Sequence, residues 1–144
     1  MTLVHVSDTY SVGADTLWRH VVRYDALEAM MSGALIRVHC PAGEERVGDD
    51  VALVFRLFDV LPVGGWRFKV VARDDARRRL RSEERGTGVK RWVHEIAIDA
   101  LPNGTARLTD TIEIDAGALT PLIAWFARRD YARRHLLRKR MVAP

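Results

Sequence analysis

The sequence contains little cysteine and no long apolar run, and each absence narrows the class of protein. Cys40 is the only cysteine in 144 residues, so no disulfide can form within the chain. This usage favours a reducing compartment, and we expect a cytoplasmic protein. Because no run reaches about 18 apolar residues, we expect neither a membrane-spanning helix nor stable insertion into a membrane. The opening residues MTLVHVSDTY lack the cationic start and long apolar segment of a signal peptide, so none is expected.

Groups that hold metals or act as activated nucleophiles are also scarce. No two of the five histidines have the close spacing of metal ligands, and Cys40 beside His39 forms only a pair. Ser11, Ser32 and Ser82 lie in no nucleophile-elbow motif. We therefore expect no metal site and no cofactor.

Positive charge is in slight excess, with a net charge of +4, and it gathers in two clusters. Arginines concentrate in residues 73–81 and again in residues 128–140, and acidic residues interleave with both clusters. We interpret them as solvated, partly paired surfaces and expect no nucleic-acid partner. The alternative is that the C-terminal arginines bind anionic lipid or nucleic acid, which would make affinity fall steeply with salt.

What is present is the composition of a globular protein. Apolar residues make up 48 % and charged residues 29 % of the chain, and 144 residues suffice for a sizeable core. No internal repeat or low-complexity linker interrupts the sequence, so we expect a single domain over residues 1–144.

Hydrophobic periodicity predicts one strand, two short helices, a run of antiparallel strands and a long helix. Residues 2–10 alternate as a strand, and residues 14–22 and 25–31 have helical spacing. Six further strands are expected at residues 34–40, 50–60, 66–72, 77–85, 89–99 and 106–116. The expected turns lie at residues 61–65 and at Pro102-Asn103-Gly104, and residues 77–85 form a polar strand with little to bury. The last helix begins near Thr120, with Pro121 at its first position, and continues through Met141.

This order predicts an α+β fold in which a curved antiparallel sheet of about seven strands wraps the C-terminal helix. A curved sheet has one face to bury, and only the last helix is large enough to cover it. Such a sheet can leave a space beneath the helix, where small ligands bind.

Three segments resemble small bacterial members of the START/Bet v 1-like superfamily, also called SRPBCC or polyketide cyclase/dehydrase-like, which has a helix-grip fold. They are TLWRHVVRYDALEAMMSG, WVHEIAIDALPNGTARLTDTIEI and YARRHLLRKRM. The resemblance covers nearly the whole chain. It implies a pocket between sheet and long helix that binds a lipid, polyketide or aromatic molecule; some members of the superfamily are cyclases or dehydratases, whereas others only carry a ligand.

Strand parity brings one histidine and one aspartate to the same face. His94 alternates in line with Trp92 and Ile96, and Asp110 is in line with Ile112. A turn centred near residues 103–104 pairs His94 with a residue near 112, which makes Asp110 its diagonal neighbour. The pair is either a structural or ligand-orienting contact between buried polar groups, or an oriented general base of a cyclase or dehydratase.

The predicted function is therefore binding of a small hydrophobic or amphipathic molecule, with the enzyme as the alternative. The predicted lining comprises Phe55, Leu57, Trp66, Phe68, Trp92, His94, Ile96, Asp110, Ile112, Leu122, Trp125 and Phe126. Arg56 is read either as solvent-facing or as the anchor of an acidic ligand group. His135 is expected to pack the last helix against the sheet. A homodimer through a sheet edge or helix is left open.

Overall fold

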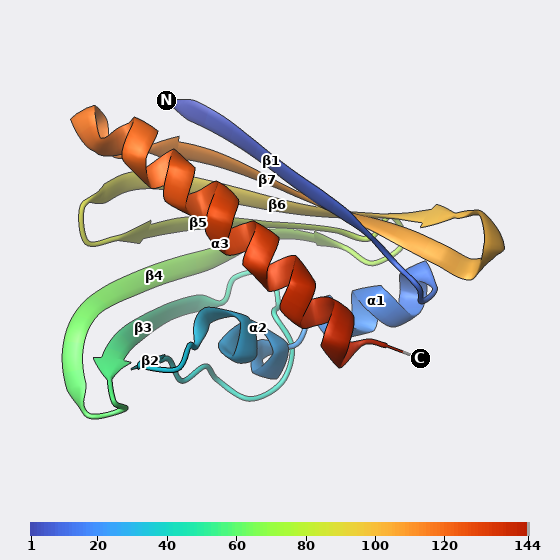
Figure 1. The fold of residues 1–144 in the computed structure, drawn as a ribbon, viewed down its shortest axis with the longest axis horizontal. Coiled ribbons are helices and arrows are strands. Elements are labelled where there is room, and N and C mark those ends of the chain that lie inside the picture. Colours follow the sequence, from blue (N-terminus) through green and yellow to red (C-terminus); the bar gives the residue numbers. More distant parts are fainter. Residues whose placement is uncertain (144) are drawn as a thin grey trace.

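The structure is a computed structural model that describes residues 1–143. Figure 1 shows its helices and strands in chain order. They are β1 (Thr2–Tyr10), α1 (Ala14–Val21), α2 (Tyr24–Met31), β2 (Ile36–Arg37), β3 (Asp50–Leu57), β4 (Leu61–Asp74), β5 (Arg79–Gly86), β6 (Val89–Leu101), β7 (Thr105–Asp115) and α3 (Thr120–Met141). Short 3₁₀ turns at Pro102–Gly104 and Gly117–Leu119 precede β7 and α3.

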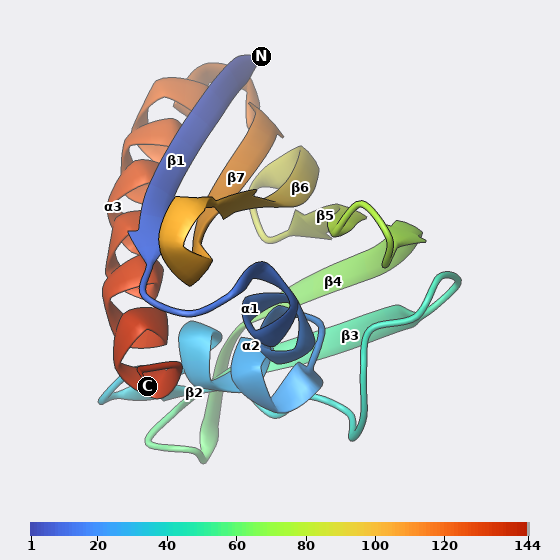
Figure 2. The same cartoon turned by 90° about the vertical axis from the view of Figure 1, so that its right-hand side faces the viewer.

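Across residues 1–143 the strands form one antiparallel sheet of seven strands, in the order β1-β7-β6-β5-β4-β3-β2. Figure 2 shows α3 beside β1 and β7, while the sheet curves away through β5 and β4 to β3. The predicted fold class, a curved sheet around a long C-terminal helix with two short helices after the first strand, is confirmed. None of the helices within residues 1–143 combines the length and the hydrophobicity that a membrane-spanning helix requires.

The long helix packs closely on one side of the sheet because its contact residues there are small. Ala124 and Ala127 are buried against Val4, Ile112 and Ile114, which are fully buried. The small alanine side chains let the helix approach the sheet closely on this side of the interior.

The loop between β3 and β4 differs from the prediction. The turn lies at residues 58–60, where Phe58 and Asp59 have positive φ angles of 52° and 59°. The predicted turn at residues 61–65 is wrong, because these residues already belong to β4. A Cβ at Gly65 would meet the Leu53 carbonyl oxygen at 3.6 Å, and the ladder shifts register between Phe55 and Arg56. The two glycines therefore lie within a strand beside a bulge here rather than in a turn.

The strand predicted at residues 34–40 is much shorter than expected. Only Ile36 and Arg37 pair with β3. Farther along, the Val38 amide donates to Ser32 Oγ at 3.1 Å and the Cys40 amide donates to Glu28 Oε1 at 2.6 Å. Side chains of the preceding helix region thus satisfy backbone donors that a longer strand would have paired.

β5 also corrects the sequence interpretation, which gave this strand little to bury. Leu80 and Ser82 are buried, and the Glu84 side chain is only 12 % exposed. Strand parity directs these alternate residues to the concave face regardless of their polarity. A polar strand of this sheet therefore supplies part of the interior.

Candidate functional site

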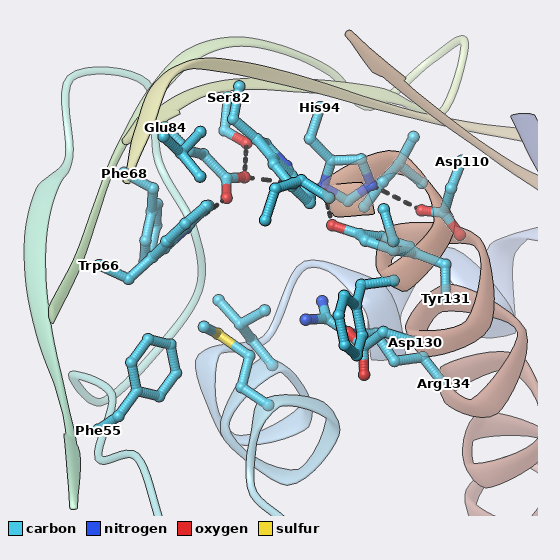
Figure 3. A pocket seen from close by; sticks show the side chains of 18 of the residues that line it. Phe55, Trp66, Phe68, Ser82, Glu84, His94, Asp110, Asp130, Tyr131 and Arg134 are labelled. Carbon is cyan, nitrogen blue, oxygen red and sulfur yellow. Dashed lines mark hydrogen bonds and ion pairs between the residues drawn. The ribbon is translucent and has the colours of Figure 1, made fainter. Parts of the chain in front are cut away.

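A cavity of about 590 Å³ lies between the concave face of the sheet, α3 and the short helices. Figure 3 shows its aromatic side chains on one side and a polar group around His94 on the other. Its lining is Val21, Leu27, Met31, Glu45, Phe55, Val63, Gly64, Gly65, Trp66, Phe68, Leu80, Ser82, Glu84, Thr87, Val89, Trp92, His94, Ile96, Asp110, Ile123, Phe126, Ala127, Asp130, Tyr131, Arg134 and Arg138. The wall is thus mainly apolar, with ionisable groups at a few positions.

Most of the predicted lining residues border this cavity. They are Phe55, Trp66, Phe68, Trp92, His94, Ile96, Asp110 and Phe126. Leu122 and Trp125 lie outside it and are about half exposed, because the cavity-facing stripe of α3 runs through Ile123 and Ala127 instead.

Two more predicted lining residues lie outside the cavity, on strands. Ile112 faces the interior but is sealed beneath α3 in the packed core. Leu57 follows the register shift in β3 and lies beyond the cavity wall. Arg56 is outside it too, and its guanidinium donates to the Val60 carbonyl at 3.3 Å.

The strand register brings His94 and Asp110 together as predicted. His94 pairs with Ile112 and Asp110 pairs with Ile96 across β6 and β7, so the two polar residues are diagonal neighbours. Nε2 of His94 lies 2.7 Å from Oδ1 of Asp110 in a hydrogen bond. The tight turn Pro102–Gly104 fixes this register and hence the contact.

Glu84 and Tyr131 complete the polar group on the cavity side of the imidazole. Glu84 Oε1 lies 3.8 Å and the Tyr131 hydroxyl 3.5 Å from Nδ1 of His94. The carboxylate of Glu84 is held in place by hydrogen bonds from Ser82 Oγ at 2.6 Å and Trp66 Nε1 at 2.7 Å. Its orientation toward His94 is therefore fixed by two donors (Figure 3).

This arrangement favours a charged imidazole. Burial disfavours the charge on His94, but Asp110 and Glu84 outweigh burial and raise its pKa to about 9. Burial likewise disfavours the carboxylate of Asp110, yet His135 and His94 hold its pKa well below the ordinary range. A charged ring acts as an acid and hydrogen-bond donor, whereas the alternative of a general base requires the neutral ring.

A second histidine supports Asp110 from behind. His135 is fully buried, its Nε2 lies at an ion-pair distance of 3.0 Å from Oδ2 of Asp110, and its Nδ1 bonds the Tyr10 hydroxyl at 2.5 Å. His135 thus joins α3 to β1 and β7, which confirms its predicted packing role. Asp110 consequently faces one histidine on each carboxylate oxygen.

Another buried carboxyl faces the cavity from the loop before β3. Glu45 is buried, and burial together with the nearby charge of Glu84 raises its pKa to about 8. It is therefore neutral at pH 7 and can donate a hydrogen bond. No loop pattern signals this orientation, because the neighbours that bury Glu45 come from other parts of the chain.

Sequence reasoning also missed Glu84, Tyr131 and Arg134. Parity along β5 would have found Glu84, and helical spacing from Ala127 would have found Tyr131 and Arg134. Both signals were present, but charged residues in mixed-charge segments are ordinarily exposed. Within residues 1–143, no three His, Cys, Asp or Glu side chains are arranged as metal ligands.

The comparisons with known proteins identify a family and a fold. The family model described as a domain of unknown function (DUF8410) matches residues 9–141. None of the curated proteins compared with the chain matches it.

Several solved structures share the fold at low sequence identity. A protein from Chromobacterium violaceum aligns with a TM-score of 0.79 and 16 % identity, over 99 % of this chain and 97 % of its own. The Zhui aromatase/cyclase from Streptomyces sp. R1128 aligns with a TM-score of 0.63 and 19 % identity, over 98 % and 90 %. Norcoclaurine synthase from Thalictrum flavum aligns with a TM-score of 0.69 and 15 % identity, over 99 % and 93 %. The chain therefore belongs to the DUF8410 family, and it has the Bet v 1-like (START, SRPBCC) helix-grip fold that its sequence motifs resemble.

Proposed function

We propose that the protein binds a small hydrophobic or amphipathic molecule in the cavity, without covalent chemistry. The observation that carries this proposal is the cavity of about 590 Å³ with an aromatic wall and a few ionisable groups. Ligand sites in proteins have volumes of roughly 300–1,000 Å³ and this same mixture of apolar wall and sparse polar groups.

The polar group around His94 gives the ligand an orientation. Nε2 of His94 is committed to Asp110, whereas Nδ1 has only the longer contacts to Tyr131 and Glu84. A carbonyl or hydroxyl oxygen of the ligand would accept a hydrogen bond from this Nδ1–H. The apolar part would then lie against Phe55 and Phe68 on the opposite wall.

The test fills the cavity and measures binding of the neutral dye Nile red by fluorescence titration. Ser82→Trp places an indole inside the cavity, and we expect at least about tenfold weaker binding because apolar contact area is lost. Glu83→Trp is the matched control, since the next residue of β5 points to the outer face and is exposed. Unchanged binding by Ser82→Trp, with the fold intact by circular dichroism, would contradict the proposal.

An enzyme of the cyclase or dehydratase type is the second candidate. It is favoured by an imidazolium, a phenol and a carboxylate meeting at one wall of the cavity, and by structural neighbours named aromatase/cyclase and norcoclaurine synthase. In a dehydration, His94 would protonate the leaving hydroxyl, which departs as water, while Glu84 takes the proton from the adjacent carbon.

The enzyme is tested with a β-hydroxy ketone whose conversion to the enone is followed by absorbance. We expect His94→Ala to abolish turnover and also to lower the melting temperature, because it leaves the buried carboxylates of Asp110 and Glu84 without this cation, while circular dichroism still shows a folded protein. Loss of the fold in this variant would favour the structural role of the pair instead.

The cytoplasmic location favoured by the single cysteine stays a prediction.

A further inference from the structure

The last residue of the cavity-facing stripe of α3 is a buried arginine. The stripe runs through Ile123, Ala127, Tyr131, Arg134 and Arg138 at spacings of three and four residues. The 15 residue-to-residue steps from its first to its last member correspond to about 22 Å along the helix axis. The cavity therefore extends along much of α3, and Arg138 forms its inner end with only 8 % of its surface exposed.

Arg138 differs from the other cations near it because its charge is unpaired. Nε of Arg134 lies 2.7 Å from Oδ2 of Asp130. Nζ of Lys139 lies 2.7 Å from Oδ1 of Asp8. Among residues 1–143, no carboxylate oxygen lies within 4.0 Å of the Arg138 guanidinium, and its buried Nε has no hydrogen-bond partner. A buried cation without a counterion is costly, so folded proteins ordinarily pair it.

The polar neighbours of Arg138 cannot supply the missing charge. The Tyr10 hydroxyl, which carries no charge at neutral pH, is close enough to Arg138 for a hydrogen bond, and the charge of Arg138 also acts on His20 and Asp110. Asp110 already faces His94 and His135 on its two oxygens. His20 is also a donor-capable group whose buried Nε2 lacks a partner in the described chain. Near Arg138 there are thus donors without a partner, Nε of Arg138 and Nε2 of His20, whereas both oxygens of Asp110 already face histidines.

We propose that the ligand is an amphipathic carboxylic acid whose carboxylate pairs with Arg138 at the inner end of the cavity. This inference rests on the proposed binding function. The planar guanidinium fork matches a carboxylate in geometry and in charge. A dianion such as a phosphate monoester would bring a second negative charge close to the carboxylate of Asp110, which would repel it. The apolar remainder extends along α3 toward Phe126 and Val63, which line the cavity and are 56 % and 53 % exposed. Arg138 thereby takes the acid-anchoring role that the sequence interpretation left open for Arg56.

The test compares acids with matched alcohols at neutral pH. The probes are dodecanoic acid against dodecan-1-ol and 1-pyrenebutanoic acid against 1-pyrenebutanol, with dissociation constants from Nile red displacement. We expect the wild type to bind each acid at least about tenfold more tightly than its alcohol, as a buried charge-assisted pair provides.

Three variants locate the source of this preference. Arg138→Met keeps an unbranched, flexible side chain but removes the charge, and it should abolish the preference for each acid over its matched alcohol. Arg138→Lys keeps the charge and should retain part of the preference. Arg128→Met is the matched control, because Arg128 is an exposed arginine of the same helix outside the cavity lining, and it should behave as the wild type.

The outcomes separate this inference from the proposed function. Equal affinity for acids and alcohols in the wild type, or a preference that survives Arg138→Met, would overturn the role of Arg138 but leave the binding cavity. Failure of all four probes to bind would instead overturn the binding function and this inference with it. Should Arg138→Met unfold, Arg138→Lys decides, since a shortened cation must alter the ratio of acid to alcohol affinity.

Discussion

The space beneath α3 has two halves that differ in how the helix meets the sheet. On the side of β1 and β7, Ala124 and Ala127 lie against fully buried aliphatic residues such as Val4 and Ile114. On the side of β3 to β5, the helix presents larger residues such as Tyr131 and the sheet lies farther away, which leaves the cavity.

The strand registers follow the same division. Within residues 1–143, register shifts interrupt the pairings β3–β4, β4–β5 and β5–β6. The pairings β6–β7 and β1–β7 run without a break over the full paired length. Bulges increase local bend and twist, so the interrupted strands curve away from the helix while the continuous ones stay beneath it. The cavity therefore lies under the half of the sheet with irregular pairing, and the half with regular pairing packs against the helix.

The largest expected effect is at Asp110, which joins the two halves. Asp110→Asn removes the charge that faces His94 and His135 in a buried site, and we expect a loss of about 4 kcal/mol in unfolding free energy by urea denaturation. Asp130→Asn breaks a partly exposed pair with Arg134 and should lose less than about 1 kcal/mol. Similar losses of unfolding free energy in both variants would contradict the expected difference between a buried and a partly exposed ion pair.

Truncation of one apolar residue in each half tests the comparison directly. Ile112→Ala, in the packed half, should lower the unfolding free energy by about 3 kcal/mol, because the neighbours cannot close the void. Phe55→Ala, in the open half, enlarges an existing cavity and should lose less than about 1 kcal/mol while weakening Nile red binding about fivefold. If Phe55→Ala were the more destabilising change, the open half would be a packed core.

Stability should fall as the pH rises from about 6.5 to 9. The pKa of His94 is raised to about 9 in the folded protein, so its contribution is complete below the unfolded pKa of about 6.5 and is lost as pH passes 9. The pKa of Glu45 is also raised, to about 8, so its contribution to the stability of the folded state is lost as the pH rises from about 4.5 to 8.

We expect a total decrease on the order of 2 kcal/mol, measured as urea midpoints across this pH range. His94→Gln should flatten the upper part of the profile, and Glu45→Gln the lower part. A wild-type profile that is flat above pH 6.5 would exclude a charged His94 in the folded state.

The smallest expected effect distinguishes neighbouring residues on α3. Phe126→Ser removes a ring from the cavity lining and should weaken Nile red binding about threefold. Trp125→Ser lies outside the lining and should leave binding unchanged, with less than about 0.5 kcal/mol change in unfolding free energy. Equal effects on binding would show that the dye contacts the outer face of the helix.

Much of the fold and part of the site could be predicted from local pattern. Alternation along β1, β6 and β7 and the Pro102–Gly104 turn predict the strands, their register and the contact between His94 and Asp110. The inward orientation of Glu84 was missed although parity gives it, because composition favours an exposed charged strand. The turn at residues 58–60 was missed because the adjacent glycines are the stronger local turn signal.

The sequence by itself determined the order of elements, the alternation of faces and the pairing that joins His94 to Asp110, since these depend on residues close in the chain or linked by one tight turn. Only the tertiary structure decided that a cavity remains, that Glu45 and Arg138 border it, and that carboxylates surround His94 and favour its charged form. Cavity size depends on the distance between α3 and strands far away in sequence, and the charge depends on carboxylates brought from other strands. Neither property is contained in any local segment.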